Sequence, residues 1–380
     1  MTATRVRAGL DGVVAAETRL SGVDGEAGEL VIAGFAVEEI APQATFEEVV
    51  FLLRNDALPT NAQLSEFRRA LASLRTLPAI TLEVLQAAAD RKAAPMDALR
   101  MAVGTLGLET DQDNLAERDT DALRLVAAVP TLVAAYARLL HGKPPVAPRP
   151  DLGHAANYLY MLNDTEPTAA QSRALDTYLN TVADHGLNAS TFAARVIVST
   201  QSDLVSAIVG AIGALKGPLH GGAPGPALEM VFEIGQPEAA EAYLRKKLER
   251  GERLMGFGHR IYKVRDPRAD VLAKAAQQLY SSDGDKAIYA LALHVEQTAL
   301  RLLEEYKPGR RLQTNVEFYT ALLLHGLDLL PELFTPTFAI GRVAGWIAHC
   351  FEQRRLDRIL RPQSVYTGER NRRWIPAQMR

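Results

Sequence analysis

Apolar residues recur at helical spacing along most of this 380-residue chain. In SDLVSAIVGAIGALKG, residues 202–217, the apolar side chains fall on one face of a helix that Ser202 can cap and Gly217 ends. Strand-like sequence is confined to the N-terminal region, where residues 12–34 predict a small hairpin. The predicted fold class is therefore all-α with a small N-terminal β-hairpin. Further helices are predicted over residues 46–54, 61–75, 121–141, 151–162, 168–184, 237–250, 287–306, 316–326 and 336–356, and from Asp266 onward.

The charge of the chain is nearly balanced, with 42 Lys and Arg against 45 Asp and Glu and a net charge of −3. Nucleic acids and anionic membranes select basic surfaces, so neither is expected as a partner. The one cysteine, Cys350, excludes an intramolecular disulfide and favours a reducing compartment. The N-terminus has no signal-peptide pattern, and no uninterrupted run of about 18 apolar residues predicts a membrane span. We expect a cytoplasmic protein.

Two stretches that combine glycine and proline with a histidine stand out. KGPLHGGAPG, residues 216–225, contains His220 and is not expected to form a helix or a strand, because proline lacks a backbone donor and glycine loosens the chain. LMGFGHRIYKVRDPRAD, residues 254–270, contains His259 in a glycine turn. Its G-x-G follows no strand and is therefore a weak phosphate signal. Both stretches are candidates for a domain junction.

Two arginines occupy positions where an anion is the natural partner. Arg268 lies in the first turn of a helix after Asp266, where the helix dipole disfavours a cation and attracts an anion; a solvated side chain is the alternative. Arg342 lies inside the most apolar helix of the chain, where a charge is costly unless it faces an acidic partner or an anionic ligand.

The remaining polar candidates have ordinary explanations as well. His185 follows a helix end and Glu317 opens an apolar helix, and in both places the helix dipole favours that residue type. Five other histidines lack special surroundings in the sequence: His141, His154, His294, His325 and His349. Two loop histidines with an acidic residue and arginines suit acid–base chemistry on a carboxylate substrate, and they also suit a His/His/Glu metal site. A non-catalytic helical scaffold is a third reading.

Four motifs in order resemble the citrate synthase family, including the 2-methylcitrate synthases: GPLHGGAP, MGFGHRIYKVRDPRA, NVEFY and FTPTFAIGRVAGWIAHCFEQ. The N-terminal GLDGVVAAETRLS and FEEVVFLLRNDALPT are also similar, so the resemblance covers nearly the whole chain. It implies a two-domain helical homodimer. The large domain would comprise residues 1–223 and 323–380, and the small domain, residues 224–322, would close over a cleft about a hinge beside His220.

The resemblance also implies roles for the residues singled out above. His220 matches the histidine that holds the thioester carbonyl of acetyl-CoA, and Glu317 stands where the family usually has the aspartate that removes the methyl proton. His259 matches the histidine that polarises the oxaloacetate carbonyl and protonates the alkoxide. Hydrolysis of citryl-CoA then yields citrate and CoA, so the implied enzyme is an acyltransferase of the Si type that converts the acyl group to an alkyl group and feeds the tricarboxylic acid cycle.

Substrate-binding residues are implied in the same way. His185, Arg268 and Arg342 match the residues that bind oxaloacetate, and Arg361 matches an arginine that reaches into the partner subunit's site. The family implies no metal and no cofactor beyond the CoA thioester substrate. The alternative substrate is propionyl-CoA, as in 2-methylcitrate synthases; a metal-dependent hydrolase using His220, His259 and Glu317 is a further alternative. The cations near the loops expected to hold CoA are Arg260, Lys263, Arg310 and Arg311.

The chain departs from the family pattern at three places. Glu317 is one methylene longer than the usual aspartate, so the base must be re-aimed, and position matters greatly in catalysis. LVIAGF lacks the YRG common near the N-terminus, and AAPM replaces the usual HPM. These last two lie outside the residues assigned to chemistry and bear on the subfamily rather than on the reaction.

Overall fold

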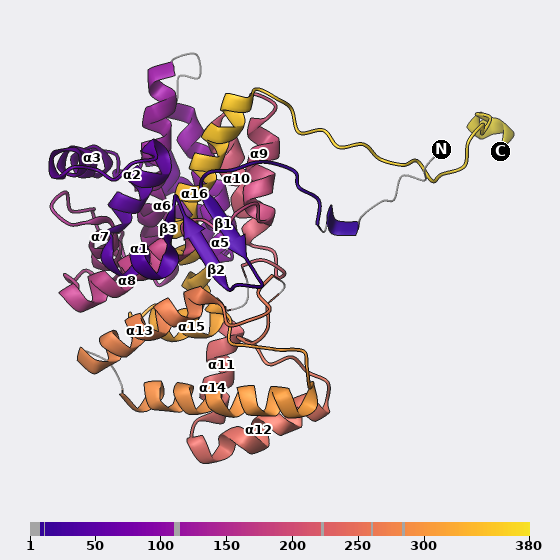
Figure 1. Cartoon of the computed structure of the whole chain (residues 1–380). Helices are drawn as coiled ribbons and strands as arrows, with labels where there is room; N and C mark the ends of the chain where they lie inside the picture. Colours follow the sequence, from indigo (N-terminus) through magenta and orange to yellow (C-terminus); the bar gives the residue numbers. More distant parts are fainter. Residues whose placement is uncertain (1–7, 11, 110–114, 222–223, 260, 283–285) are drawn as a thin grey trace.

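The computed structural model describes residues 8–10, 12–109, 115–221, 224–259, 261–282 and 286–380. The fold is almost entirely helical, as the sequence predicted (Figure 1). The helices are α1 (Val37–Gln43), α2 (Phe46–Asn55), α3 (Asn61–Ser73), α4 (Ala79–Asp90), α5 (Pro95–Thr105), α6 (Leu115–Leu140), α7 (His154–Asn163), α8 (Ala169–Val182), α9 (Ala189–Val198), α10 (Leu204–Leu215), α11 (Pro224–Ile234), α12 (Pro237–Glu249), α13 (Pro267–Ser282), α14 (Lys286–Tyr306), α15 (Val316–Gly326) and α16 (Phe334–Leu356).

The predicted N-terminal hairpin is present and carries a third short strand. Strands β1 (Ser21–Asp24), β2 (Glu29–Ile32) and β3 (Phe35–Ala36) form an antiparallel sheet in that order. The β1–β2 turn packs against the segment that follows His259, because the Lys263 backbone N–H donates to the Gly25 carbonyl at 2.8 Å. The hairpin therefore contacts one of the two histidine loops.

Helix starts follow local capping rules. Thr45, Thr60 and Thr168 each form a capping box with an acid or amide three residues later. For α10 the cap is Asp203, whose side chain accepts the Ser206 N–H, so the expectation that Ser202 caps this helix was wrong. A carboxylate one residue closer to the helix also suits the dipole.

The structure adds helices that apolar spacing did not reveal, namely α1, α4, α5, α9 and α11. The last of these corrects the expectation that residues 216–225 form no helix, because α11 begins at Pro224. Proline is well accommodated in the first turn of a helix, where its missing N–H would have no partner. The stretch around His220 is therefore a turn that leads into a helix.

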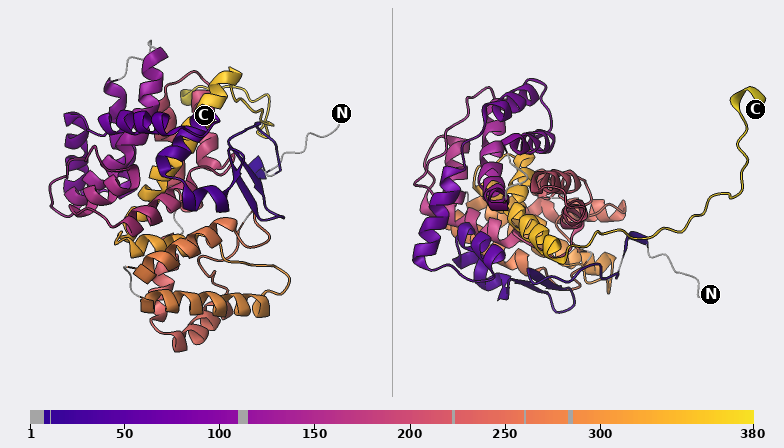
Figure 2. Two further views of the ribbon diagram at one scale, coloured as in Figure 1. Left: turned by 60° about the vertical axis from the view of Figure 1, so that its left-hand side comes forward. Right: turned by 90° about the horizontal axis from the view of Figure 1, so that it is seen from above.

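The helices form an upper body and a lower group (Figures 1 and 2). Helix α16 runs through the upper body, and α11 to α15 make up the lower group, with α13 packed against α1, α8 and α15. Residues 357–380, which follow α16, are largely exposed and run away from the body (Figure 2). Within the described residues, Thr120–Leu140 of α6 is long and apolar enough to cross a membrane, but 72% of that window is buried inside the molecule, as in a core helix.

Candidate active site

A cleft of about 280 Å³ lies between the lower helices and the upper body. Helices α13 and α15 and the loop before α13 form one wall, and α8, α16 and the segment around His220 form the other. The structure thus brings together residues that lie far apart in the sequence. Six of the residues predicted from the sequence line this cleft together: His185, His220, His259, Arg268, Glu317 and Arg342.

Glycines shape the His259 loop. Gly256 and Gly258 have φ angles of +85° and +82°, which strain any residue with a side chain, and a Cβ on Gly256 would press against Phe318. The loop pairs with the segment that leads into α15: Gly258 N–H donates to the Gln313 carbonyl at 2.7 Å. The G-x-G pattern therefore fixes His259 relative to the start of α15.

Glu317 lies in the first turn of α15, where the Asn315 side chain accepts its backbone N–H at 3.0 Å. Burial raises the pKa of the Glu317 carboxyl to about 7, although the charges of Arg268 and Arg342 oppose this rise. A carboxyl group with a pKa near neutrality can both accept and release a proton under physiological conditions, which is what a general base requires.

His259 has a defined proton position. Its Nδ1 lies 3.1 Å from the backbone N–H groups of both Ile261 and Tyr262, and because these groups can only donate, Nδ1 is an acceptor. Burial, reinforced by Arg268, lowers the pKa of His259 to about 4, so the ring is neutral at pH 7. The ring proton is therefore on Nε2, and this nitrogen is a hydrogen-bond donor.

Contacts with Ser190 determine which ring nitrogen of His220 carries the proton. Its Nε2 lies 2.7 Å from the Ser190 hydroxyl and 3.4 Å from the Ser190 backbone N–H, which can only donate. Burial and the charge of Arg342 lower the pKa of His220 to about 4. The ring is therefore neutral with its proton on Nδ1. The position after His220 requires glycine, because a Cβ on Gly221 would lie 2.5 Å from the Leu215 carbonyl oxygen.

The two cleft arginines are both buried but are paired differently. Arg268 is 4% exposed and makes two side-chain hydrogen bonds to Asp266, at 3.0 and 2.8 Å, so it is not the solvated arginine of the alternative interpretation. Arg342 is 1% exposed and donates to the Val182 carbonyl, and among the described residues no carboxylate lies within 4.0 Å of it. Burial lowers the pKa of Arg342 to about 10, which still leaves it charged at pH 7.

His185 is buried beside these arginines. Its Nε2 lies 3.1 Å from the Tyr262 hydroxyl, and its ring centroid is 6.2 Å from that of His259. Burial, with Arg268 and Arg342, holds the pKa of His185 well below its ordinary value. The interpretation of this residue as a cation at a helix end was therefore wrong, because the ring is neutral and available for hydrogen bonding.

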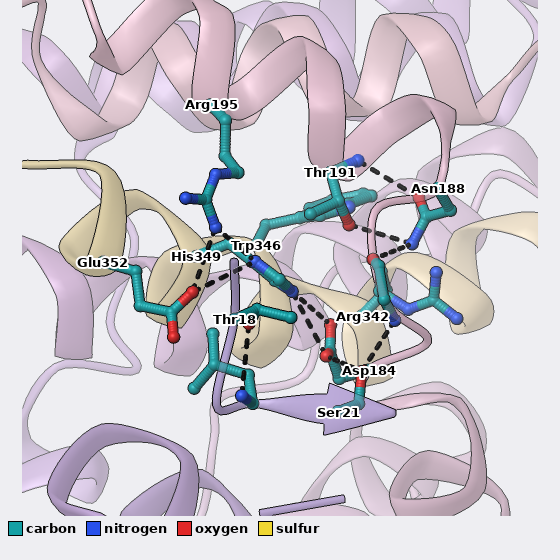
Figure 3. Close-up of polar contacts among 12 residues, drawn as sticks. Thr18, Ser21, Asp184, Asn188, Thr191, Arg195, Arg342, Trp346, His349 and Glu352 are labelled. Atoms are coloured by element: carbon teal, nitrogen blue, oxygen red, sulfur yellow. Dashed lines mark hydrogen bonds and ion pairs between the residues drawn. The ribbon is translucent and has the colours of Figure 1, made fainter. Parts of the chain in front are cut away.

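Sequence reasoning missed polar residues behind the cleft. His349, which the sequence left without special surroundings, is fully buried with Nε2 3.2 Å from the Asp184 carboxylate (Figure 3). Ser190, next to His220, was also missed. The available signal was the spacing of Arg342, His349 and Gln353 in the apolar helix α16, which places these polar residues on one face.

The remaining predicted residues that the structure describes lie outside the cleft lining. Lys263, Arg310 and Arg311 are exposed, and Arg260 lies outside the described residues, so their assignment to CoA stays a prediction. Arg361 is exposed in the extended segment after α16. Within the described part of the chain, no three His, Cys, Asp or Glu side chains are grouped closely enough to hold a metal ion, and this includes the His220, His259 and Glu317 set.

Comparisons with known proteins cover the whole chain. The family model described as "Citrate synthase, C-terminal domain" matches residues 9–363. Citrate synthase 2 of Bacillus subtilis is 41% identical over 383 residues, which span 100% of both chains. The 2-methylcitrate synthase of Mycobacterium tuberculosis is 39% identical over 371 residues, which cover 97% of this chain and 92% of the relative.

Solved structures agree with these matches. The crystal structure of citrate synthase from Pyrobaculum aerophilum has a TM-score of 0.90 and 39% identity, covering 98% of this chain and 95% of that one. A citrate synthase from Thermoplasma acidophilum, solved as a ternary complex with carboxymethyl coenzyme A and oxaloacetate, has a TM-score of 0.90 and 29% identity, covering 99% and 100%. The all-α fold class predicted from the sequence is confirmed, and the chain belongs to the citrate synthase family, whose members are acyltransferases.

Proposed function

We propose that this chain condenses acetyl-CoA with oxaloacetate and water to give citrate and CoA. The observation that carries the proposal is the set of proton states in one cleft. Glu317 has a pKa of about 7, and His220 and His259 are neutral rings whose proton-bearing nitrogens are fixed by backbone donors. One base and two neutral donors are what formation and capture of an enol require.

The first half of the reaction is enolisation. Glu317 takes a proton from the methyl group of acetyl-CoA, while the Nδ1–H of His220 donates to the thioester oxygen, where negative charge develops. Because the ring is neutral, its N–H is a very weak acid and stabilises this charge by a hydrogen bond. The pKa of Glu317, raised by burial, moves closer to that of the weakly acidic methyl group.

The second half is carbon–carbon bond formation. The enol carbon attacks the ketone of oxaloacetate, whose oxygen accepts the Nε2–H of His259, and the resulting alkoxide takes that proton. Arg342 and Arg268 bind the two carboxylates by charge-assisted hydrogen bonds, and His185 completes the contact. Water then cleaves the thioester of citryl-CoA to release CoA.

A steady-state assay of CoA release tests the proposal. Purified protein with oxaloacetate is given acetyl-CoA or propionyl-CoA, each with and without EDTA. A citrate synthase has the higher kcat/KM with acetyl-CoA, and because the thioesters differ by one methylene, worth about 1–3 kcal/mol, we expect a preference of about tenfold or more. We expect no effect of EDTA. Preference for propionyl-CoA would assign a 2-methylcitrate synthase, which the Mycobacterium tuberculosis relative makes the second candidate. CoA release from neither substrate would refute the proposal.

We also propose that residues 224–322 form a small domain that closes over the cleft about a hinge beside His220. Support comes from the division of the cleft: His259, Arg268 and Glu317 belong to this range, whereas His185 and Arg342 do not. The enzyme is proposed to act in the cytoplasm without a metal or other cofactor, and its CoA phosphates are proposed to contact Arg260, Lys263, Arg310 and Arg311.

The chain is further proposed to act as a homodimer in which Arg361 completes the partner's cleft. The exposed position of Arg361, in a segment that leaves its own subunit, supports this arrangement. Arg361→Ala and His259→Ala homodimers should each be nearly inactive. Mixed dimers, verified with different tags, should recover about one quarter of wild-type activity, because about half the dimers then contain one intact site. Verified mixed dimers without activity would refute the shared site.

A further inference from the structure

Helix α16 carries a polar face through the middle of the upper body. Arg342, Trp346, His349 and Gln353 are spaced four, three and four residues apart, which places them on one side of the helix. Each is at most 1% exposed. Arg342 reaches the cleft, whereas Trp346, His349 and Gln353 do not line it. We call these four residues the polar face of α16; Figure 3 shows Arg342, Trp346 and His349 with the contacts of His349.

Beside the polar face, two glycines of α16 pack closely on the end of α8 and on the segment that leads to His185. A Cβ added to Gly345 would lie 2.3 Å from the Ala183 carbonyl oxygen, and one added to Gly341 would lie 2.9 Å from the Leu179 carbonyl oxygen. Only glycine lets the two backbones approach this closely. Small displacements of α16 are therefore transmitted directly to the backbone beside the cleft.

Trp346 connects to His220 through Ser190. The Trp346 Nε1–H donates to the Ser190 hydroxyl oxygen at 3.0 Å, and this oxygen lies 2.7 Å from His220 Nε2. Because an indole can only donate, the Ser190 proton must point away from Trp346, toward His220 or toward Asn188 Oδ1 at 2.8 Å. The indole thus limits the hydroxyl that faces His220 to these two orientations.

His349 connects to His185 through Asp184. Arg195 Nη1 lies 3.0 Å from His349 Nδ1, and because a guanidinium can only donate, Nδ1 is an acceptor and Nε2 carries the proton toward Asp184 (Figure 3). Asp184 also accepts the Ser21 hydroxyl proton, and the oxygen of Ser21 accepts the Gly186 N–H at 2.7 Å. Both chain neighbours of His185 are therefore held by this network.

We infer that Trp346 and His349 are positioning residues for the two histidines of the upper wall, Trp346 acting on His220 through Ser190 and His349 acting on His185 through Asp184. This inference rests on the proposed function. It separates the two halves of the reaction, because His220 serves enolisation and His185 serves oxaloacetate binding. Neither positioning residue touches substrate, and each acts through one intermediate side chain.

The first test uses Trp346→Phe, which keeps an aromatic ring and removes the N–H. We expect kcat to fall about tenfold, the worth of one hydrogen bond at the upper end of its range, with the KM for oxaloacetate unchanged. Exchange of the acetyl-CoA methyl protons with deuterium, measured with a dicarboxylate that lacks the ketone, should fall equally. In a Ser190→Ala background, Trp346→Phe should cause no further fall in kcat or in the exchange rate, because Ser190, the side chain through which Trp346 acts, is already absent.

The second test compares His349→Leu with His349→Gln. Leucine removes the donor to Asp184 and should raise the KM for oxaloacetate about tenfold while leaving methyl-proton exchange unchanged. Glutamine keeps a donor near the Nε2 position and should restore most of the affinity. The matched control is Thr337→Val, also on α16. It removes a buried hydrogen bond to Tyr158 of α7 and should change neither the KM for oxaloacetate nor methyl-proton exchange.

The outcomes separate the inference from the proposed function. If the wild-type protein releases CoA, two outcomes contradict the inference and leave the proposed function standing. One is that the effects of Trp346→Phe and Ser190→Ala add. The other is that Trp346→Phe and His349→Leu change the KM for oxaloacetate and methyl-proton exchange alike. If the wild-type protein releases no CoA from either thioester, the proposed function is wrong and the inference fails with it. Melting temperatures matching that of Thr337→Val exclude a general loss of structure.

Discussion

Two groups of buried polar side chains, one behind the upper wall of the cleft and one facing the cleft, are partnered very differently. Behind the wall, Arg195 contacts Glu352 at 3.0 Å and His349 contacts Asp184 at 3.2 Å. In the cleft, Arg342 donates to the Val182 carbonyl and lies over the Phe338 ring but has no carboxylate partner among the described residues, and burial raises the pKa of Glu317 to about 7. A buried charge is costly unless it is paired. A buried arginine without a carboxylate partner, such as Arg342, therefore indicates a ligand-binding position, and the cleft adds Arg268, which is held in place by Asp266.

The largest expected effect comes from removing the base. Glu317→Gln keeps the shape of the side chain and removes the proton acceptor, so kcat should fall by about 10²–10⁴, the range for a positioned general base. Substrate affinity should be largely kept. Steady-state CoA release measures this, and Thr337→Val again serves as the control.

Turnover of the Glu317→Gln variant within a few-fold of the parent would mean that another residue is the base. Glu317→Asp tests the extra methylene separately. The shorter side chain restores the family's usual residue without restoring its position in this cleft, so we expect reduced but measurable activity.

The next effect concerns the cleft arginines, of which Arg342 has no carboxylate partner and Arg268 is paired with Asp266. Arg342→Leu should raise the KM for oxaloacetate about 10- to 100-fold, since a charge-assisted hydrogen bond contributes about 1.5–3 kcal/mol. The KM for acetyl-CoA should change little. Arg268→Leu should act in the same direction. Equal effects on the two substrates would indicate a loss of structure rather than of a binding group.

The group around Arg195, behind the wall, should respond in the opposite way. Arg195→Leu leaves Glu352 Oε2, His349 Nδ1 and Gln353 Oε1 without the Arg195 donor, so the free energy of unfolding should fall by about 3 kcal/mol. Arg342→Leu should cost much less stability, because it removes a buried charge that has no carboxylate partner. Urea unfolding measures both, and equal losses would erase the distinction between the two groups.

These two arginines also show how far the sequence predicts the site. A charge inside an apolar helix is visible in the sequence, so Arg342 was identified, and the two loop histidines stood out among glycines. The partner of a buried charge is not visible: Glu352 lies 157 residues from Arg195. His349 looked ordinary because a lone histidine in an apolar helix has no pattern until Asp184 is placed beside it. Helix α1 was missed because seven residues give too short an apolar pattern, and α11 was missed because it begins with proline and glycine residues that were interpreted as a loop.

The smallest expected effect is a pH dependence of stability. The pKa of Glu317 is about 7 in the folded chain and is ordinary when the chain is unfolded, so between these values the folded state binds more protons. Its contribution to stability therefore falls as the pH rises through this window. Thermal melts at pH 5 and pH 8 should show the Glu317→Gln variant gaining stability relative to the parent at the higher pH. A relative loss would contradict the raised pKa.

The most direct test of the central claim is a calorimetric comparison of oxaloacetate with pyruvate, which lacks the second carboxylate. If the cleft cations are arranged for a dicarboxylate, wild-type protein binds oxaloacetate about 10- to 100-fold more tightly than pyruvate, and Arg342→Leu removes most of that difference. Equal affinity for the two acids, or a difference that persists in Arg342→Leu, would contradict the claim that the unpaired charge of this cleft serves its substrate.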